Sequence, residues 1–277
     1  MILYPHAKIN IGLSVIERRS DGYHNIETFF YPVPLCDILT VEPAKVGKLT
    51  FSCHGIPLSE CEPLNNLCCR AYNILDADFC LPPTNIRLQK IIPAGAGLGG
   101  GSSDAAFTLM ALNDLYKLQI SNEKMNEYAD RLGSDCPFFL QKRPAFASGK
   151  GELLTPVRLS LDDYYIMIVK PPASVNTTEA YSWIKPKTRK NQLFELLNEP
   201  VYKWRHNVFN DFEEAVFEKF PQIAEAKEML YLCGAIYASM SGSGACVFGI
   251  FSENPENMSS QLPDSFFVKI ISNHHII

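Results

Sequence analysis

The sequence has no apolar run of membrane-spanning length, and its first residues, Met1 to His6, lack the basic region and long apolar core of a signal peptide. Its nine cysteines form no Cys-x-x-Cys pair, and its six histidines show no metal-ligand spacing. These absences argue against a membrane protein, a disulfide-linked secreted domain and a structural zinc site. We therefore expect a cytoplasmic protein without a structural metal.

Basic charge is also in short supply. The 277 residues carry a net charge of -5 with a pI near 5.7, which argues against a general nucleic-acid binder. Hydrophobic residues make up 47% and charged residues 20% of the chain, as in an ordinary soluble globular protein. The length allows one large domain or two modest ones.

The most informative segment is a glycine-rich loop at residues 93–104, which reads Pro-Ala-Gly-Ala-Gly-Leu-Gly-Gly-Gly-Ser-Ser-Asp. An apolar-periodic stretch follows at residues 105–118 and predicts a helix, for which Ser102, Ser103 and Asp104 are expected to supply capping groups. Glycines allow close approach of the backbone to a ligand, and a helix N-terminus presents unpaired amides to an anion. The segment therefore predicts a site for the phosphates of a nucleotide.

Two other phosphate-binding patterns fit this loop less well. Residues 95–100 match G-x-G-x-x-G, but the acidic residue at about the right distance, Asp114, lies inside the predicted helix. The pattern G-x-x-x-x-G-K-[ST] fails because no lysine precedes Ser102. A nicotinamide-dependent oxidoreductase, a non-catalytic nucleotide-binding module and a glycine linker without a ligand remain alternatives. If the loop binds phosphate, the neutralising lysine must come from elsewhere in the chain.

The segments before and after the loop predict alternating strands and helices. Residues 7–15 alternate as in a half-buried strand, with Lys8 and Asn10 on its open face, and Asp21-Gly22 predicts a turn into a second strand. Ser121 is expected to cap a helix that Gly133 ends, and the apolar spacing places four residues on its inward face: Met125, Tyr128, Ala129 and Leu132. The other predicted elements before residue 158 are strands at 37–41, 49–53 and 85–92 and a helix at 65–75.

The organisation changes near residue 158, where we place a domain boundary between residues 1–158 and 159–277. A strand is expected at 164–169, followed by a polar, proline-bounded connection at 185–200. Two helices at 212–220 and 222–232 are separated by Pro221. Two further strands are joined by a glycine-rich turn, Ser241 to Gly244.

Five segments, in order, resemble the motifs of the GHMP kinases, which include galactokinase, homoserine kinase and mevalonate kinase. They are Ala7 to Leu13, Arg19 to His24, the glycine loop, Gly133 to Phe139 and Ser241 to Gly244. The first motif usually begins Pro-Ala-Lys, and here His6 intervenes after Pro5. Within the superfamily, the Asp-Gly-Tyr-His segment is most similar to the kinases that phosphorylate the 2-hydroxyl of 4-diphosphocytidyl-2-C-methyl-D-erythritol in non-mevalonate isoprenoid biosynthesis.

That resemblance implies an α/β fold of two domains. The N-terminal domain, residues 1–158, would bind ATP and be similar to ribosomal protein S5, and the C-terminal domain, residues 159–277, would be ferredoxin-like. The expected co-substrate is ATP with Mg²⁺, the expected partner is a small cytidylyl substrate, and no tightly bound cofactor is expected. Neither nucleic acid nor membrane is an expected partner. The sequence does not specify an oligomeric state.

The resemblance also assigns two catalytic residues. Asp135 would accept the proton of the attacking hydroxyl, as a general base. Lys8 would hold Asp135 ionised and offset charge on the transferred phosphoryl group. From the local sequence alone, Asp135 fits a helix cap equally well and Lys8 fits a solvated strand residue.

Binding residues follow from the same resemblance. Tyr23 would stack on the cytosine and His24 would read its polar edge, with Phe30 closing the pocket. Asn10 and Thr177 would make further polar contacts to the substrate. The residues expected to bind ATP are Asn65, Lys90, Pro93, Ala94, Gly95, Ala96, Gly97, Leu98, Gly99, Gly100, Gly101, Ser102 and Ser103. Ser102 is also a candidate oxygen donor to Mg²⁺, and the Ser241 to Gly244 turn fits either a phosphate contact or a plain hairpin.

Overall fold

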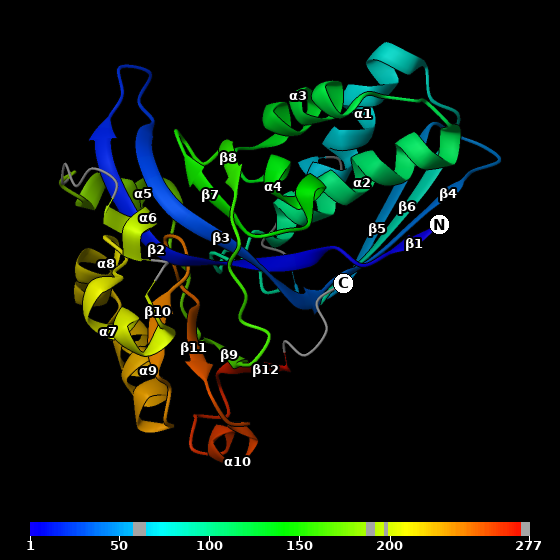
Figure 1. The fold of residues 1–277 in the computed structure, drawn as a ribbon. Helices are drawn as coiled ribbons and strands as arrows, with labels where there is room; N and C mark the ends of the chain where they lie inside the picture. The colour runs from blue at the N-terminus through cyan, green and yellow to red at the C-terminus, as the bar shows by residue number, and fades with distance from the viewer. Residues whose placement is uncertain (58–64, 187–191, 197–198, 273–277) are drawn as a thin grey trace. The chain divides into compact units, whose positions relative to one another are not determined.

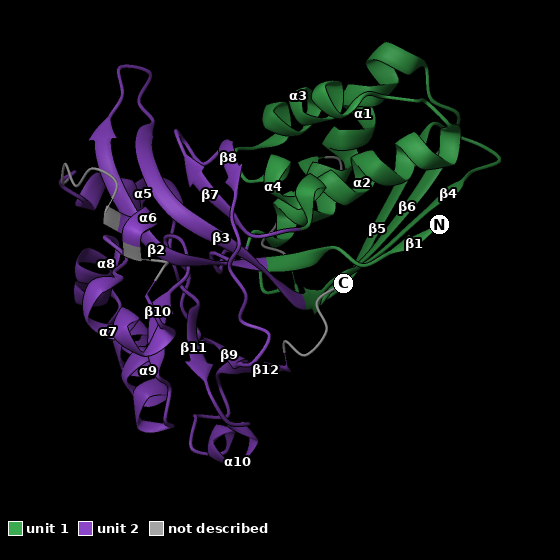
Figure 2. Cartoon of the chain, viewed as in Figure 1, with its two compact units in different colours: residues 1–7, 35–94, 99–142 green, residues 8–34, 95–98, 143–277 purple. Residues whose placement is uncertain are grey.

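The computed structural model describes residues 1–57, 65–186, 192–196 and 199–272, which form two compact units (Figures 1 and 2). Unit 1 comprises residues 1–7, 35–94 and 99–142, and unit 2 comprises residues 8–34, 95–98 and 143–277. Both units are assembled from separate stretches of the chain, so each depends on contacts between distant residues. The sequence division at residue 158 stays a prediction.

Unit 1 contains a sheet with the strand order β1-β4-β6-β5. Its strands are β1 (Ile2–Leu3), β4 (Ile38–Pro43), β5 (Leu49–Gly55) and β6 (Thr84–Lys90). Strand β4 pairs antiparallel with β1 and β6, whereas β5 and β6 are parallel. A parallel pair needs a crossover connection, and helix α1 (Leu67–Phe79) lies on it.

The other described helices of unit 1 are α2 (Gly100–Tyr116), α3 (Asn122–Leu132) and α4 (Cys136–Gln141). Helix α3 follows its local sequence signals: the Ser121 hydroxyl accepts a hydrogen bond from the Lys124 amide, and Gly133 is the C-cap. Its buried residues are the four expected from the apolar spacing, Met125, Tyr128, Ala129 and Leu132. This helix was therefore predicted correctly.

Helix α2 begins earlier than predicted, and the predicted capping role of Ser102, Ser103 and Asp104 is wrong. Its N-cap is Gly99, which makes no side-chain capping bond, and Ser103 and Asp104 lie buried inside the helix. Gly100 belongs to the first turn, where a Cβ atom would approach Ile92 Cγ2 to 2.9 Å. Close packing at Gly100 thus overrides the low helix propensity of glycine.

Unit 2 contains two sheets. The first has the order β2-β3-β7-β8, from β2 (His6–Arg18), β3 (His24–Cys36), β7 (Ala145–Ser148) and β8 (Leu153–Pro156). The second has the order β10-β11-β9-β12, from β9 (Tyr165–Lys170), β10 (Tyr237–Met240), β11 (Val247–Phe251) and β12 (Phe267–Ser272), all antiparallel. Strands β2, β3, β9, β10 and β11 agree with the sequence-based prediction, whereas β7, β8 and β12 were not predicted.

The helices described in unit 2 are α5 (Thr177–Trp183), α6 (Gln192–Leu196), the 3₁₀ turn η2 (Val201–Lys203), α7 (Trp204–Asn207), α8 (Glu213–Lys219), α9 (Pro221–Leu232) and α10 (Glu256–Ser259). Pro221 begins α9 at its N-terminal end, as its lack of a backbone N–H favours. The core of this unit joins β2, β3, β9 and β11 to α8 and α9, with Leu13, Met167, Val216 and Leu230 among its buried side chains.

The stretch at 185–200 is not simply a polar connection. Helix α6 lies within it, and its Leu193 is 5% exposed. A Cβ atom at Gly12 would lie 2.5 Å from Leu193 Cδ1, so the helix packs directly against β2. Tertiary packing therefore stabilises a short helix that local periodicity does not reveal. Residues 187–191 and 197–198 of the stretch lie outside the described residues.

Candidate functional site

The centre of the glycine loop, residues 95–98, is held by the backbone of two distant segments of unit 2. The Lys8 amide donates to the Leu98 carbonyl at 2.9 Å, and the Cys246 amide donates to the Ala96 carbonyl at 3.2 Å. The loop thus lies between the start of β2 and the turn that joins β10 to β11. Three of the five motif segments meet here.

Lys8 and Asn10 are buried side chains, 3% and 2% exposed, so the prediction that they occupy an open strand face is wrong. Lys8 Nζ donates to Asn10 Oδ1 at 2.6 Å and to the Gly97 carbonyl at 3.1 Å. It also lies 4.8 Å from the centroid of the Phe30 ring, itself 1% exposed. The lysine that the loop lacks is therefore supplied by β2.

The backbone at the outer edge of β2 is covered as well. Three backbone amides of β2 donate hydrogen bonds to distant segments. The Lys8 amide bonds the Leu98 carbonyl, and the Leu13 amide bonds the Phe209 carbonyl at 2.9 Å. The backbone amide of Asn10 bonds the Ser241 hydroxyl at 3.2 Å. An uncovered edge strand would present unpaired peptide groups to solvent. Periodicity in the sequence cannot reveal this cover, because its three segments are distant in the chain.

Asn10 also organises polar groups inside the sheet. Its Nδ2 donates to the Thr28 hydroxyl at 3.0 Å, and that hydroxyl donates to the Gly12 carbonyl at 2.5 Å. Since its Oδ1 accepts from Lys8, the Asn10 amide is used at both ends. A buried amide in this position orients the lysine ammonium rather than simply filling space.

The Ser241 to Gly244 turn makes the closest approach to the loop. The Ser241 hydroxyl donates to the Gly97 carbonyl at 2.8 Å, and a Cβ atom at Gly97 would lie only 1.9 Å from the Ser241 carbonyl oxygen. Gly97 also has φ +73°, a left-handed conformation that favours glycine. Both constraints explain why glycine occupies this position of the loop.

The turn is in addition linked to α5. The Thr177 and Ser243 hydroxyls form a hydrogen bond of 3.0 Å, so a predicted substrate-binding residue reaches the same turn. Asn176 caps α5 by accepting from the Glu179 amide at 3.1 Å. Thr177 itself is exposed at the first position of this helix.

In unit 1, the start of α2 lies beside the segment that carries Asp135. A Cβ atom at Gly133 would lie 3.6 Å from Cys136 Sγ and 4.0 Å from Ser102 Oγ. Burial raises the pKa of the Cys136 thiol to about 12, and its contact with Ser102 opposes that rise. Asp135 occupies the N-cap position of α4, but its side chain makes no capping hydrogen bond, so the helix-cap alternative is not supported.

Lys90 lies in a buried charge cluster of unit 1. Its ammonium forms an ion pair with Asp37 and a second with Asp104 at 2.7 Å, and all three side chains are 4% exposed or less. Asp37 also accepts from the amides of Ile91 and Ile92, at 2.5 and 2.9 Å. These ion pairs link the residue before β4, the end of β6 and the first turns of α2. They therefore hold together the segments that come before and after residues 95–98 in the chain.

Burial raises the pKa of Asp104 to about 7, although Lys90 opposes that shift. Burial alone would lower the pKa of Lys90, but the two carboxylates outweigh it and raise the pKa. The Asp104 Oδ1 and Ser103 Oγ atoms are buried without a hydrogen-bond partner. Asp37 was not predicted and Asp104 was predicted only as a capping residue, because nothing in the local sequence reveals that both carboxylates pair with Lys90.

The predicted cytosine-binding residues lie after the turn at the tip of β2 and β3. Tyr23 is 60% exposed, with Lys150 Nζ 5.2 Å from its ring centroid. His24 is half-buried and stacks on Tyr181 of α5, with ring centroids 4.7 Å apart and an angle of 16°. Burial lowers the pKa of His24, which favours the neutral form of the ring. Tyr181 was not predicted, although it lies four residues after Thr177 on the same helix.

Phe30 and Asn65 complete the predicted set. Phe30 lies beneath Lys8 rather than on the surface, as its 1% exposure shows. Asn65 is exposed, immediately before the Asn66 cap of α1. Among the described residues, no group of three His, Cys, Asp or Glu side chains is arranged to hold a metal ion. Nor does any described helix have the length and apolarity to cross a membrane.

Family models match two parts of the chain. The model described as "GHMP kinases N terminal domain" matches residues 66–143, and the model described as "GHMP kinases C terminal" matches residues 190–268. The first contains the glycine loop and Asp135, and the second contains the Ser241 to Gly244 turn.

Known proteins similar to the chain agree with these matches. The 4-diphosphocytidyl-2-C-methyl-D-erythritol kinase of Bacteroides fragilis is 50% identical over 254 residues, which is 91% of this chain and 92% of that protein. A crystal structure of 4-(cytidine 5'-diphospho)-2C-methyl-D-erythritol kinase has a TM-score of 0.78 at 33% identity, over 98% of this chain and 99% of that one. The mevalonate kinase of Methanococcus jannaschii, with a TM-score of 0.72 at 13% identity over 98% of this chain and 96% of that one, shows the fold alone. The predicted α/β fold of two domains is confirmed.

Proposed function

Because the chain belongs to the 4-diphosphocytidyl-2-C-methyl-D-erythritol kinase family of the GHMP kinases, we propose that it transfers the γ-phosphoryl group of ATP to the 2-hydroxyl of that cytidylyl alcohol. The observation that carries the proposal is the meeting of Lys8, Gly97 and Ser241, which unites three motif segments around the glycine loop. A kinase needs a backbone cradle for phosphate and a cation beside it, and the position of Lys8 beside the loop supports this role for the junction.

The loop would position the phosphates of ATP. Its residues from Gly95 to Gly99 include three glycines with positive φ, so the backbone can turn sharply and leave its amides accessible. Helix α2 begins at Gly100 without a side-chain cap, so its first amides would be available to bind an anion. Phosphoryl transfer depends mainly on such positioning and on electrostatic stabilisation.

Lys8 and Asp135 would prepare the reaction. The ammonium of Lys8 is oriented by Asn10 and Gly97, which supports a role in stabilising the charge of the transferred phosphoryl group. Asp135, at the start of α4, would accept the proton of the attacking 2-hydroxyl as a general base. No phosphoenzyme is required.

Mg²⁺ would accompany ATP as part of the co-substrate and would supply positive charge that offsets the charge of the phosphates. Ser102, half-buried in the first turn of α2, has the hydroxyl oxygen best suited to approach that ion. The carboxylate nearest in sequence, Asp104, is held by Lys90 instead. We accordingly propose few protein ligands for the metal and no tightly bound cofactor, in a cytoplasmic enzyme.

Tyr23, His24 and Thr177 would bind the cytidylyl end of the substrate. The exposed Tyr23 ring offers a flat face for a base, worth about 1–3 kcal/mol by analogy with single-strand nucleic-acid stacking. Tyr181 supports the His24 ring from one side, which leaves its nitrogens to read the polar edge of the cytosine. These aromatic groups favour a nucleotide-linked alcohol over a small amino acid or carboxylic acid.

The proposal is tested by ADP release in a coupled assay with Mg-ATP and three alcohols: the diphosphocytidyl erythritol, homoserine and mevalonate. Turnover with the cytidylyl alcohol alone is expected. Turnover with homoserine or mevalonate instead would retain the kinase fold but overturn the assignment of Tyr23 and His24. Titration with NADH beside ATP separates a kinase from an oxidoreductase, because only ATP is expected to raise the melting temperature.

A further inference from the structure

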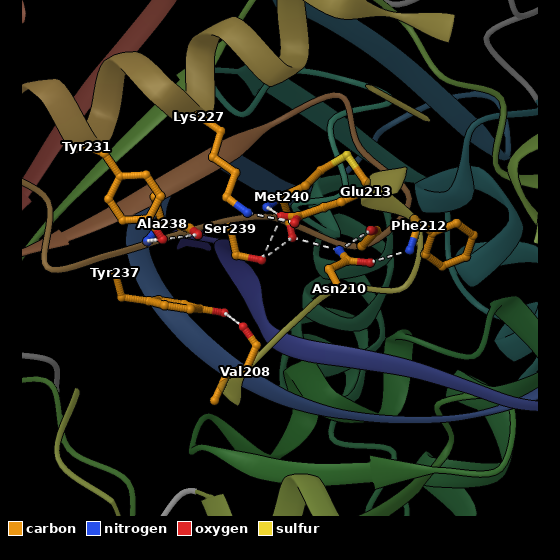
Figure 3. Close-up of polar contacts among 11 residues, drawn as sticks. Val208, Asn210, Phe212, Glu213, Lys227, Tyr231, Tyr237, Ala238, Ser239 and Met240 are labelled. Atoms are coloured by element: carbon orange, nitrogen blue, oxygen red, sulfur yellow. Dashed lines mark hydrogen bonds and ion pairs between the residues drawn. The ribbon is translucent and has the colours of Figure 1, made fainter. Parts of the chain in front are cut away.

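Strand β10 is the edge strand of its described sheet, so the peptide groups on its outer side need partners other than a strand. Ala238 and Met240 are two residues apart and direct their peptide groups to this side. At Ala238, the hydroxyl of Tyr231 accepts from the amide at 3.1 Å and donates to the carbonyl at 3.2 Å (Figure 3). One side chain thus satisfies both groups.

The side chains of Asn210 and Glu213 are the hydrogen-bond partners of the Met240 peptide groups on the same strand edge. The Glu213 carboxylate accepts from the Met240 amide at 2.8 Å and from the Ser239 hydroxyl at 3.1 Å. The Asn210 amide donates to the carbonyls of Met240 and Gly242, each at 2.8 Å. Figure 3 shows both side chains converging on the end of β10, where the strand enters the glycine-rich turn.

The side chain of Asn210 is hydrogen-bonded through both its amide nitrogen and its carbonyl oxygen. Its Oδ1 accepts from the Phe212 amide at 3.0 Å, and the side chain is 3% exposed. Its own backbone is fixed to β2, because Leu13 donates to Phe209 at 2.9 Å and accepts from Asp211 at 2.8 Å. Only a primary amide offers two donors and an acceptor in this space, which explains why asparagine occupies the position.

The two carbonyls that Asn210 binds lie on either side of Ser241. The Ser241 hydroxyl in turn donates to the Gly97 carbonyl at 2.8 Å and accepts from the backbone amide of Asn10 at 3.2 Å. Because the backbones of Gly97 and Ser241 are in close contact, a shift of Ser241 would also move Gly97. Lys8 shares that Gly97 carbonyl, so the position of its ammonium depends on the same contact.

We propose that Asn210 and Glu213 are positioning residues for phosphoryl transfer, which hold Ser241 so that the glycine loop and the Lys8 ammonium keep their reactive arrangement. This inference rests on the proposed function, because it takes Gly97 as part of the ATP loop. Neither residue touches the reacting atoms in this role; both act through the backbone of Met240 and Gly242. A small displacement of such a framework is costly, since a 1 Å misplacement can lower a rate by about a hundredfold.

The test compares Asn210→Asp with Tyr231→Phe in the full chain. The first variant keeps the shape and the acceptor for Phe212 but loses both donors. The second, the matched control, loses two hydrogen bonds to the same strand edge, away from the turn. For both we would measure the melting temperature, kcat, and the KM values for ATP and the cytidylyl alcohol.

Both variants are expected to lower the melting temperature, but only Asn210→Asp should lower kcat, by about tenfold or more. The KM for the cytidylyl alcohol should stay within about twofold, because Asn210→Asp keeps the acceptor for the Phe212 amide and so leaves the contact of Phe212 with Tyr181, beside His24, in place. Unchanged kcat in Asn210→Asp, or equal falls of kcat in both variants, would overturn the proposal and leave Asn210 a purely structural residue.

A second pair guards against a variant that does not fold. Glu213→Gln keeps an oxygen acceptor for the Met240 amide, whereas Glu213→Ala removes it. We expect the glutamine variant to retain kcat within about threefold and the alanine variant to lose most of it. Equal activity in the two would contradict a role through Met240.

Amide hydrogen exchange separates this inference from the proposed function. Exchange of the backbone amide of Asn10, which donates to the Ser241 hydroxyl, should become faster in Asn210→Asp but not in Tyr231→Phe. This readout needs no substrate. If the unmodified protein phosphorylates none of the alcohols, the proposed function fails while the exchange result still decides whether Asn210 holds the loop; unchanged exchange at Asn10 would overturn the inference by itself.

Discussion

The Ser241 hydroxyl donates a 2.8 Å hydrogen bond to the carbonyl of Gly97, a residue 144 positions earlier in the chain. This bond joins the first turn residue after β10 to the middle of the glycine loop. The two backbones are so close that no side chain fits between them at Gly97. Part of the loop's shape is therefore imposed by the last motif, and glycine substitutions in the loop should differ sharply in their effects.

Gly97→Ala should destabilise the protein far more than Gly95→Ala. Both positions have positive φ, which costs a non-glycine residue about 1–2 kcal/mol. At Gly95 the new Cβ atom would meet only Ser174 Oγ at 3.5 Å, whereas at Gly97 it would overlap the Ser241 carbonyl oxygen. Urea unfolding should show an extra loss of about 2 kcal/mol or more for Gly97→Ala. Equal losses would mean that the two backbones are not in contact in solution.

Lys8→Met should abolish most of the activity. The substitution keeps the apolar stem but removes the ammonium that binds Asn10 and Gly97. We expect kcat to fall by about a hundredfold or more, as for loss of one charge-stabilising donor. Lys170→Met is the control, because Lys170 likewise donates to a backbone carbonyl, that of Ala173, at 2.9 Å. A similar kcat in the two variants would show that the Lys8 ammonium has no role in the reaction.

Asp135→Asn should lower kcat by about a hundredfold to ten-thousandfold, the usual contribution of a general base. ATP affinity, measured by calorimetric titration, should change little, because the carboxylate would act on the acceptor alcohol. Asp130→Asn, at an exposed position of α3, serves as the comparison. Near-normal turnover in Asp135→Asn would show that the carboxylate is not the proton acceptor.

His24→Ala should weaken binding of the cytidylyl alcohol without affecting ATP. Loss of one hydrogen-bonding ring should raise the KM for the alcohol by about tenfold. His54→Ala provides the reference, since His54 is an exposed histidine on β5 in the other unit. If the KM for the alcohol matches that of the unmodified enzyme, the cytosine binds somewhere other than at His24.

Asp104 predicts a pH dependence of stability. Its pKa is raised to about 7 in the folded protein, above that of an aspartate in the unfolded chain, because burial disfavours the charged form. Between these two pKa values the folded state binds the extra proton, so the free energy of unfolding should fall as the pH rises from about 4 to about 7. Asp104→Asn should flatten that slope in urea titrations at several pH values. An unchanged slope would mean that another group titrates.

Local sequence was enough to predict the elements whose boundaries depend on nearby residues. The Ser121 cap and the four buried residues of α3 follow from spacing alone, and Pro221 separates α8 from α9 as expected. The turn at Asp21-Gly22 joins β2 to β3 for the same reason. Each of these signals acts within a few residues, where backbone geometry and capping bonds decide the outcome.

The chemistry at the loop could be predicted only in part. The glycine pattern indicated phosphate, and the missing lysine indicated a partner elsewhere, but the pattern could not identify it. Helix α2 also began before Ala105, because Gly100 packs against Ile92 and the low propensity of glycine is overridden. Where local preference and tertiary packing disagree, packing decides.

The sequence by itself determined the elements with clear local signals, such as helix α3 and strands β2 and β3, together with the glycine loop and the motif segments, because these depend on neighbouring residues and on spacing. Only the tertiary structure decided that Lys8 is buried against Gly97, that Lys90 is enclosed by Asp37 and Asp104, and that Asn210 holds the turn. The environment of a polar side chain depends on which distant segments cover it. Burial and pairing, and with them charge and pKa, therefore arise only when the chain folds.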